Sequence, residues 1–242
     1  MSVVAIVGAG PGDPGLITVR GLELLRRADV VIYDRLVNPK LLDEAPATAR
    51  LVFAGKSCGA HTLSQFEINA LLVAEARAGH RVVRLKGGDA FVFGRGGEEA
   101  LALAEAGIAF EIVPGVTSAV AVPAAAGIPL THRGVAASFA VVTGHGEAGA
   151  MTRVDWSRLA RGVDTLVVLM GLGNLRTITE TLIAHGRDPS TPAALIERGT
   201  TEAQRTIATT LAELPDAAAA AHLESPVVTV IGPVVTLRSR LS

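Results

Sequence analysis

The sequence predicts an α/β protein with two domains. Short runs rich in Val, Ile and Leu alternate with longer segments of helical pattern through the first two-thirds of the chain. Most of these apolar runs end in a glycine-rich loop. The chain has 242 residues, of which 49% are hydrophobic, and this is enough apolar material for two modest cores.

Continuous apolar strands separated by helices indicate a parallel sheet that helices cover on both faces. The expected strands of the first part are Val3–Val7, Asp29–Tyr33, Leu51–Ala54, Arg81–Leu85 and Phe110–Val113. The expected helices are Thr18–Ala28, Lys40–Ala45, Ser64–Ala78, Glu98–Ala106 and Val116–Ala126. Thr18 is suited to cap its helix, and Ser64 with Glu67 has the spacing of a capping box.

The segment Gly127–Gly134 (GIPLTHRG) interrupts this alternation. Beyond it we expect strands at Phe139–Thr143, Thr165–Met170, Ala193–Glu197, Thr206–Thr209 and Val227–Ile231. The helices expected between them are Asn174–His185 and Leu211–Ala221. We place the domain boundary near Val113–Thr117. This gives an N-terminal α/β domain of residues 1–115 and a C-terminal α/β domain of residues 116–242.

Composition argues against several classes of protein. The chain has 22 basic and 23 acidic residues, 3% aromatic residues and no Lys/Arg-rich run, so we expect no nucleic-acid binding. The only cysteine, Cys58, excludes an intramolecular disulfide and is compatible with a reducing compartment. The apolar runs are too short to span a bilayer, and the N-terminus lacks a signal-type segment. We therefore expect a cytoplasmic protein that does not bind membranes.

The first glycine loop could indicate a dinucleotide site. The glycines of Gly10–Gly15 fit G-x-G-x-x-G, and Asp34 ends the next strand about 20 residues later, where a ribose-binding acid would sit. However, Pro11 and Pro14 have no N–H for a pyrophosphate, and the helix is expected to begin near Thr18, too late for its dipole to face phosphates. Glycine loops also follow later strands, so the sequence fits a ligand contacted at many strand ends better than one held by a single glycine loop.

Nine motifs occur in order over nearly the whole chain: VGAGPGDPGLITVRG, YDRLV, GKSCGAHTLSQFEIN, RLKGGDAFVFGRGGEE, PGVTSA, AGIPLTHRG, TGH, LMGL and IERGT. Together they resemble the uroporphyrinogen-III C-methyltransferases, which belong to the tetrapyrrole methyltransferases. The resemblance implies two α/β domains with S-adenosylmethionine (SAM) in the cleft between them, rather than a dinucleotide-binding Rossmann domain.

The same resemblance implies an activity. Two methyl groups would be transferred to uroporphyrinogen III, giving precorrin-2 for sirohaem and cobalamin biosynthesis and releasing S-adenosylhomocysteine (SAH). It also implies a homodimer, no metal, and no fused dehydrogenase/ferrochelatase module of the kind found in some relatives.

Nine positions are expected to contact the cofactor, seven of them from this resemblance and two, Thr117 and Ser118, because they open a helix at a strand end. They are Pro11, Gly87, Gly88, Asp89, Val92, Thr117, Ser118, Met170 and Gly199. In chemical terms, the two adjacent glycines let the backbone approach a ligand closely, and Asp89 can accept hydrogen bonds from a ribose or an ammonium group. Taken alone, Asp89 is more readily a turn or capping acid, and Met170 a core residue.

The resemblance makes Asp34 the proton acceptor and Lys56 the proton donor. Asp34 could instead cap its strand or pair with Arg35, and Lys56 could hold a substrate carboxylate. Because the implied substrate carries eight carboxylates, we expect Arg95 to bind one of them. We expect Glu98 to orient Arg95 or to accept a pyrrole N–H, with compensation of the helix N-terminus as the simpler alternative.

Three alternative functions stay open. The first is methylation of a later precorrin, and the second is an NAD-dependent oxidoreductase. The third is a ligand-binding module without catalysis, in which substituting both Asp34 and Lys56 leaves the measurable activity unchanged.

Overall fold

The computed structural model describes residues 4–55, 63–146 and 153–241. Contacts divide the chain into two compact units, residues 1–117 and 118–242, where the sequence analysis placed the boundary after residue 115. Each unit has its own five-stranded sheet. None of the described helices has both the length and the apolar character that a bilayer-spanning segment requires.

The first unit has a parallel sheet, as predicted. Its strands are β1 (Val4–Gly8), β2 (Val30–Tyr33), β3 (Arg50–Phe53), β4 (Val82–Lys86) and β5 (Phe110–Val113). They lie in the order β3-β2-β4-β1-β5, and every neighbouring pair is parallel. The carboxyl ends of all five strands therefore meet at one edge of this sheet.

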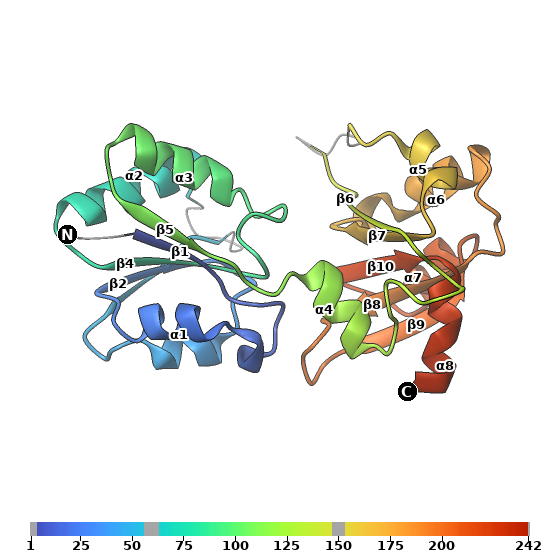
Figure 1. Cartoon of the computed structure of the whole chain (residues 1–242), viewed down its shortest axis with the longest axis horizontal. Coiled ribbons are helices and arrows are strands. Elements are labelled where there is room, and N and C mark those ends of the chain that lie inside the picture. The colour runs from blue at the N-terminus through green and yellow to red at the C-terminus, as the bar shows by residue number, and fades with distance from the viewer. Residues whose placement is uncertain (1–3, 56–62, 147–152, 242) are drawn as a thin grey trace. The chain divides into compact units, whose positions relative to one another are not determined.

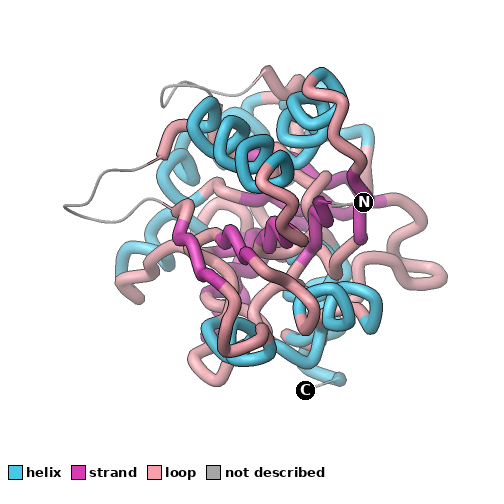
Figure 2. Tube along the Cα trace, turned by 90° about the vertical axis from the view of Figure 1, so that its left-hand side faces the viewer, coloured by secondary structure: helices cyan, strands magenta, loops and turns pink. Residues whose placement is uncertain are grey.

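Helices cover both faces of this sheet (Figures 1 and 2). They are α1 (Val19–Leu25) on one face, and α2 (Gln65–Arg77) and α3 (Gly96–Glu105) on the other. Alternate residues of β4 belong to two apolar clusters: Val82 lies in one, and Val83 and Leu85 lie in the other. Because strand side chains alternate between faces, Arg84 and Lys86 share the face of Val82, beneath α2 and α3.

The predicted caps are confirmed. The side chain of Thr18 accepts a hydrogen bond from Gly21 N, so α1 begins at Val19. Ser64 and Glu67 form both bonds of the capping box at the start of α2. The helix predicted at Lys40–Ala45 is instead a 3₁₀ segment, Pro39–Glu44, which Asn38 caps. Proline has no N–H and is readily accommodated at the start of such a turn.

The second unit has a mixed sheet. Its strands are β6 (Phe139–Thr143), β7 (Thr165–Leu169), β8 (Pro192–Glu197), β9 (Arg205–Thr210) and β10 (Val227–Ile231). They lie in the order β6-β7-β10-β8-β9. Only the β6–β7 pair is parallel among these described strands. The sequence located the strands but did not indicate their directions.

The structure describes five α-helices in the second unit. They are α4 (Ser118–Ala125), α5 (Trp156–Gly162), α6 (Leu175–Ala184), α7 (Leu214–Ala220) and α8 (Arg238–Leu241). Residues of α5, α6 and α7 form one apolar cluster with the strands, whereas α4 contacts β7 and β10. The sequence analysis missed α5 and α8, and each is too short for a clear periodic pattern. Trp156 is buried in this cluster.

Asp29 links the starts of β2 and β4. Its carboxylate accepts hydrogen bonds from the Arg81 backbone N (2.8 Å), Nε (3.0 Å) and NH2 (2.6 Å). The hydrogen bonds from the Arg81 side chain, followed by the one from its backbone, lower the pKa of Asp29 from 3.8 to about 2. A carboxyl group whose pKa is lower in the folded state stabilises the fold above its unfolded pKa and loses that contribution on acidification.

We therefore predict that the Asp29→Asn variant unfolds more readily than the wild type at pH 7, by a modest amount because the ion pair is largely exposed. The difference should shrink as the pH falls from about 4 towards 2. Urea unfolding of both proteins over this range measures it. A difference that is the same at pH 7 and pH 2 would contradict this assignment.

Candidate functional site

Three glycines lie against one another where β1, β4 and β5 end. A Cβ atom on Gly115 would lie 2.3 Å from the Gly88 carbonyl oxygen and 2.6 Å from the Gly8 Cα. The backbones of Gly10 and Gly88 exchange two hydrogen bonds, of 3.1 and 2.6 Å. Only glycine permits this approach, so the loops after three strands are held together at the carboxyl edge of the sheet.

Asp89 connects two of these loops. Its Oδ1 accepts a hydrogen bond from Phe91 N (2.8 Å), and its Oδ2 accepts one from Gly115 N (2.9 Å). The turn role that residue type alone suggests for Asp89 is therefore confirmed. Each carboxylate oxygen keeps a further lone pair, so this geometry leaves Asp89 able to accept a hydrogen bond from a ligand.

The other positions of the first unit that the sequence analysis expects to contact a cofactor lie in these same loops. Pro11 follows Gly10 and is half-buried, as is Val92 after Asp89. A Cβ on Gly87 would lie 2.9 Å from the Leu36 Cβ, so the loop after β4 also packs on the loop after β2. Because α1 begins only at Val19, its N-terminus is displaced from the glycine loop, as the argument against a dinucleotide site requires.

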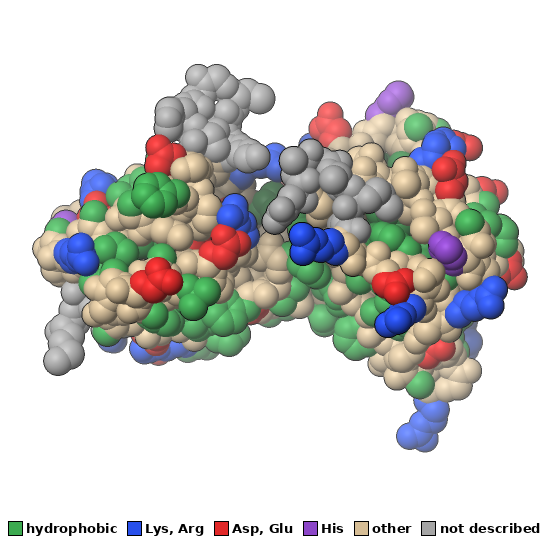
Figure 3. Space-filling view, turned by 90° about the horizontal axis from the view of Figure 1, so that it is seen from above, with side chains coloured by type: hydrophobic (Ala, Val, Ile, Leu, Met, Phe, Trp, Pro, Cys, Tyr) green, Lys and Arg blue, Asp and Glu red, His purple; other side chains and the backbone are tan. Residues whose placement is uncertain are grey.

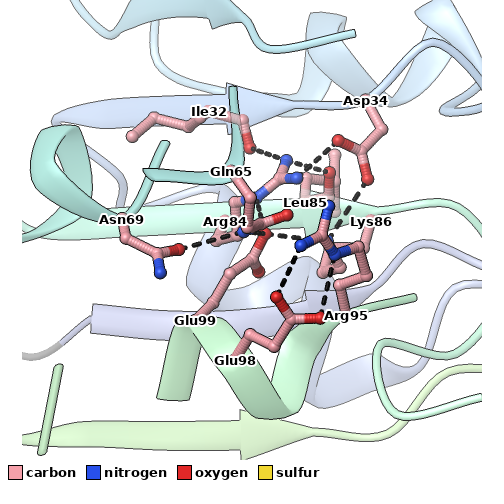
Figure 4. A network of polar contacts seen from close by, with 10 residues as sticks. All are labelled: Ile32, Asp34, Gln65, Asn69, Arg84, Leu85, Lys86, Arg95, Glu98 and Glu99. Atoms are coloured by element: carbon pink, nitrogen blue, oxygen red, sulfur yellow. Dashed lines mark hydrogen bonds and ion pairs between the residues drawn. The ribbon is translucent and has the colours of Figure 1, made fainter. Parts of the chain in front are cut away.

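A network of buried charges lies beside these loops (Figure 4). Arg84 and Lys86 of β4 are the cations, and Glu99 of α3 and Asp34, which follows β2, are the anions. Arg84 NH2 donates to Asp34 Oδ1 (2.5 Å), and Arg84 Nε donates to Glu99 Oε1 (3.0 Å). Lys86 Nζ lies 2.9 Å from Glu99 Oε1 and 3.5 Å from Asp34 Oδ2.

Asp34 is the accessible member of this network. Its side chain is 28% exposed, against 4% or less for Arg84, Lys86 and Glu99. Among the described residues Asp34 pairs with Arg84 and Lys86 rather than with Arg35, which corrects that part of the sequence analysis. The network therefore presents one fixed carboxylate at the carboxyl edge of the sheet.

Sequence reasoning missed Arg84, Lys86 and Glu99 as site residues. Two signals were present. The segment RVVRLK extends the expected strand Arg81–Leu85 by one residue, and Arg84 and Lys86 stand at alternate positions in it, so both fall on one face of the strand. The start of α3 has two adjacent acids, which point in different directions on a helix, so one of them can face the sheet while the other faces solvent.

Arg95 and Glu98 form an ion pair at the start of α3. Arg95 Nε donates to Glu98 Oε1 (2.9 Å), and Arg95 NH2 donates to Glu98 Oε2 (2.6 Å). The predicted contact, in which Glu98 orients Arg95, is thus confirmed. The hydrogen bond from Arg95 lowers the pKa of Glu98 below its usual range, so the pair persists at neutral pH. A substrate carboxylate would have to share or displace Glu98.

Replacing Glu98 by glutamine tests this competition. The variant frees Arg95 from a charged partner, so we predict that the KM for an anionic substrate changes by about threefold or more while its affinity for SAH does not change. Steady-state kinetics at two salt concentrations, with SAH binding by calorimetry, would measure this. An unchanged KM would remove Arg95 and Glu98 from substrate binding.

Acidic and basic side chains are interspersed on the face that Figure 3 shows, in keeping with the formal net charge of -1. An anionic ligand would thus be met by local groups rather than by a broad basic field.

In the second unit, Met170 and Gly199 follow strands that run in the same direction. Both β7 and β8 are antiparallel to β10, so their ends lie at one edge of the sheet. Met170 has φ 55° and is 52% exposed, so it is not the core residue that residue type alone would suggest. A Cβ on Gly199 would lie 2.3 Å from a methyl group of Val122 in α4. Ser118 is the first residue of this helix, and Thr117 immediately precedes it.

Two residues of the sequence analysis cannot be placed. Lys56, the expected proton donor, and Cys58 lie outside the described residues. Among the described residues there is no group of three or more His, Cys, Asp or Glu side chains that could hold a metal ion.

Comparison with known proteins identifies the family. Residues 3–215 match the family model of Tetrapyrrole (Corrin/Porphyrin) Methylases. The chain belongs to this family. It is 51% identical over 235 residues to the uroporphyrinogen-III C-methyltransferase of Priestia megaterium, and the match covers 97% of this chain and 99% of that protein.

Other relatives of this methylase chain are longer. It is 53% identical over 239 residues to siroheme synthase 2 of Aeromonas hydrophila, covering 99% of the chain but 50% of that protein. The chain thus spans about half the length of the siroheme synthases that it matches. Among solved structures, the uroporphyrin-III C-methyl transferase of Thermus thermophilus complexed with S-adenyl homocysteine has a TM-score of 0.84 and 45% identity, covering 98% of this chain and all of that one.

Proposed function

We propose that the chain is a SAM-dependent C-methyltransferase that adds two methyl groups to uroporphyrinogen III, forming precorrin-2 and SAH. One observation carries this proposal: the 51% identity that extends over 99% of the Priestia megaterium uroporphyrinogen-III C-methyltransferase. We also propose that the enzyme is a cytoplasmic homodimer and that its product serves sirohaem or cobalamin biosynthesis.

The glycine loops of the first unit fit SAM. They pack closely on one another at the carboxyl edge of the sheet, where their backbones leave no room for a Cβ atom, and Pro11, which has no N–H, lies in one of them. SAM has no phosphates, so it needs neither the amide donors nor the helix N-terminus of a dinucleotide site. The SAH in the Thermus thermophilus relative supports the choice. We assign the cofactor to Pro11, Gly87, Gly88, Asp89, Val92, Thr117, Ser118, Met170 and Gly199.

SAM, when bound, supplies an electrophilic methyl group that a pyrrole β-carbon attacks in line, so that a C–C bond forms and the C–S bond electrons return to sulfur. Positive charge then develops on the pyrrole ring, which must lose a proton. The Asp34 carboxylate, fixed by Arg84, can stabilise that charge and accept the proton. Arg95 can bind a substrate carboxylate, and alignment of the reacting atoms accounts for much of the rate.

Binding and label transfer test the proposal. Calorimetry should show that the protein binds SAH and not NADH. Anaerobic incubation with methyl-labelled SAM and uroporphyrinogen III should then transfer label to the tetrapyrrole. SAH binding without transfer would favour methylation of a later precorrin, and failure to bind SAH would contradict a SAM-dependent function.

A further inference from the structure

We infer that Glu99 is a positioning residue for Asp34. It holds the Lys86 ammonium away from the Asp34 carboxylate, so that Asp34 Oδ2 stays available to the substrate. This inference rests on the proposed function, because it specifies how that function's acidic residue is kept accessible.

The two acids compete for the same cations. Lys86 Nζ is within hydrogen-bond distance of Glu99 Oε1 (2.9 Å), whereas its distance to Asp34 Oδ2 (3.5 Å) is that of a looser ion pair. Arg84 contacts both acids and so fixes where they lie relative to one another. Glu99 therefore holds Lys86, and Asp34 is bound tightly through Oδ1 alone.

Burial makes the charge of Glu99 matter. The side chain of Glu99 is fully buried, and the four residues carry two positive and two negative charges. Removing the charge of Glu99 would leave two buried cations facing Asp34 alone, in surroundings where an unpaired charge is costly. The Lys86 ammonium would then be expected to move onto Asp34 Oδ2.

The other groups that face Glu99 do not replace its charge. Gln65 of α2 donates through Nε2 to Glu99 Oε1 (3.3 Å), and the same nitrogen donates to Asn69 Oδ1 (2.9 Å). Both are neutral amides. Arg95 and Glu98, at the start of α3, are paired with each other (Figure 4). Glu99 Oε2 has no hydrogen-bond partner within the described part of the chain.

The test is a pair of variants measured in two backgrounds. Glu99→Gln keeps the shape of the side chain and removes its charge. We expect its kcat for methyl transfer to uroporphyrinogen III to fall about tenfold or more, with KM for SAM and affinity for SAH within about twofold of wild type. Glu105→Gln, the same change at the exposed end of α3, should leave kcat unchanged.

The second background is Asp34→Asn. If Glu99 acts through Asp34, adding Glu99→Gln to Asp34→Asn should change single-turnover transfer by less than about twofold. An equal loss in both backgrounds, or a kcat of Glu99→Gln within about twofold of wild type, would overturn the inference.

Two measurements keep the outcome interpretable. If Glu99→Gln does not fold, Glu99→Asp, which keeps the charge on a shorter side chain, is taken through the same cycle. Its fall in kcat should again be nearly absent in the Asp34→Asn background. An equal fall in both backgrounds would overturn the inference. The wild-type protein is assayed first: absence of methyl transfer there would contradict the proposed function, whereas normal transfer by every Glu99 variant would contradict the inference alone.

Discussion

Replacing Arg84 by methionine is expected to lower the free energy of unfolding by about 3–5 kcal/mol. Arg84 is almost fully buried and bonds to two acids, Asp34 and Glu99. Methionine matches the aliphatic part of the arginine side chain and has no charge, so the variant would leave two carboxylates with Lys86 as their only described cation. Urea or thermal unfolding measures the loss.

The matched control is Arg81→Met, in the residue that precedes β4. Arg81 pairs with Asp29 on the surface, with 61% of its side chain exposed, so its loss should be much smaller. Equal losses of stability in the two variants would show that breaking the buried network around Arg84 costs no more than breaking an exposed ion pair.

Replacing Gly115 by alanine is the second change with a large expected effect. The new methyl group would lie 2.3 Å from the Gly88 carbonyl oxygen and 2.6 Å from the Gly8 Cα, and both of these neighbours are backbone atoms that cannot rotate away. The loops after β4 and β5 must therefore separate. We expect stability to fall by about 1–3 kcal/mol. We also expect affinity for SAH to fall tenfold or more, which corresponds to about 1.4 kcal/mol or more.

Gly97→Ala is the control for this variant. A Cβ on Gly97 meets no atom within 4 Å, and the residue lies in α3, where alanine is favoured over glycine by about 0.5–1 kcal/mol. The control should keep or gain stability and keep its affinity for SAH. SAH affinity that survives in Gly115→Ala would mean that the contact of the three loops is not part of the cofactor site.

Local patterns in the sequence were sufficient for most of the fold. The runs ending at Val7 and Tyr33 could be assigned as strands because they are continuously apolar, and such strands pack between two helical layers. The antiparallel pairing of β7, β8 and β10 could not be predicted in this way. Strand direction depends on which segments pair across the chain, and an apolar strand has the same pattern in either direction.

The candidate site was only partly predictable. Asp34 and Asp89 stand out because each follows an expected strand, and Asp89 also lies in a glycine-rich loop. The partner of Asp34 is Arg84, 50 positions further along the chain, and the two meet only because β2 and β4 are neighbours in the sheet. No local spacing reveals that pairing. Glu99 is hidden for the same reason, since its bond to Arg84 depends on how α3 packs on the sheet.

The most direct measurement counts the methyl groups that are transferred. The pure protein is incubated anaerobically with SAM and enzymatically generated uroporphyrinogen III, and the product is analysed by mass spectrometry. We predict a gain of two methyl groups, with SAH released in matching amount. A product mass that is unchanged, in a preparation that still binds SAH, would contradict the assignment of uroporphyrinogen III as the substrate.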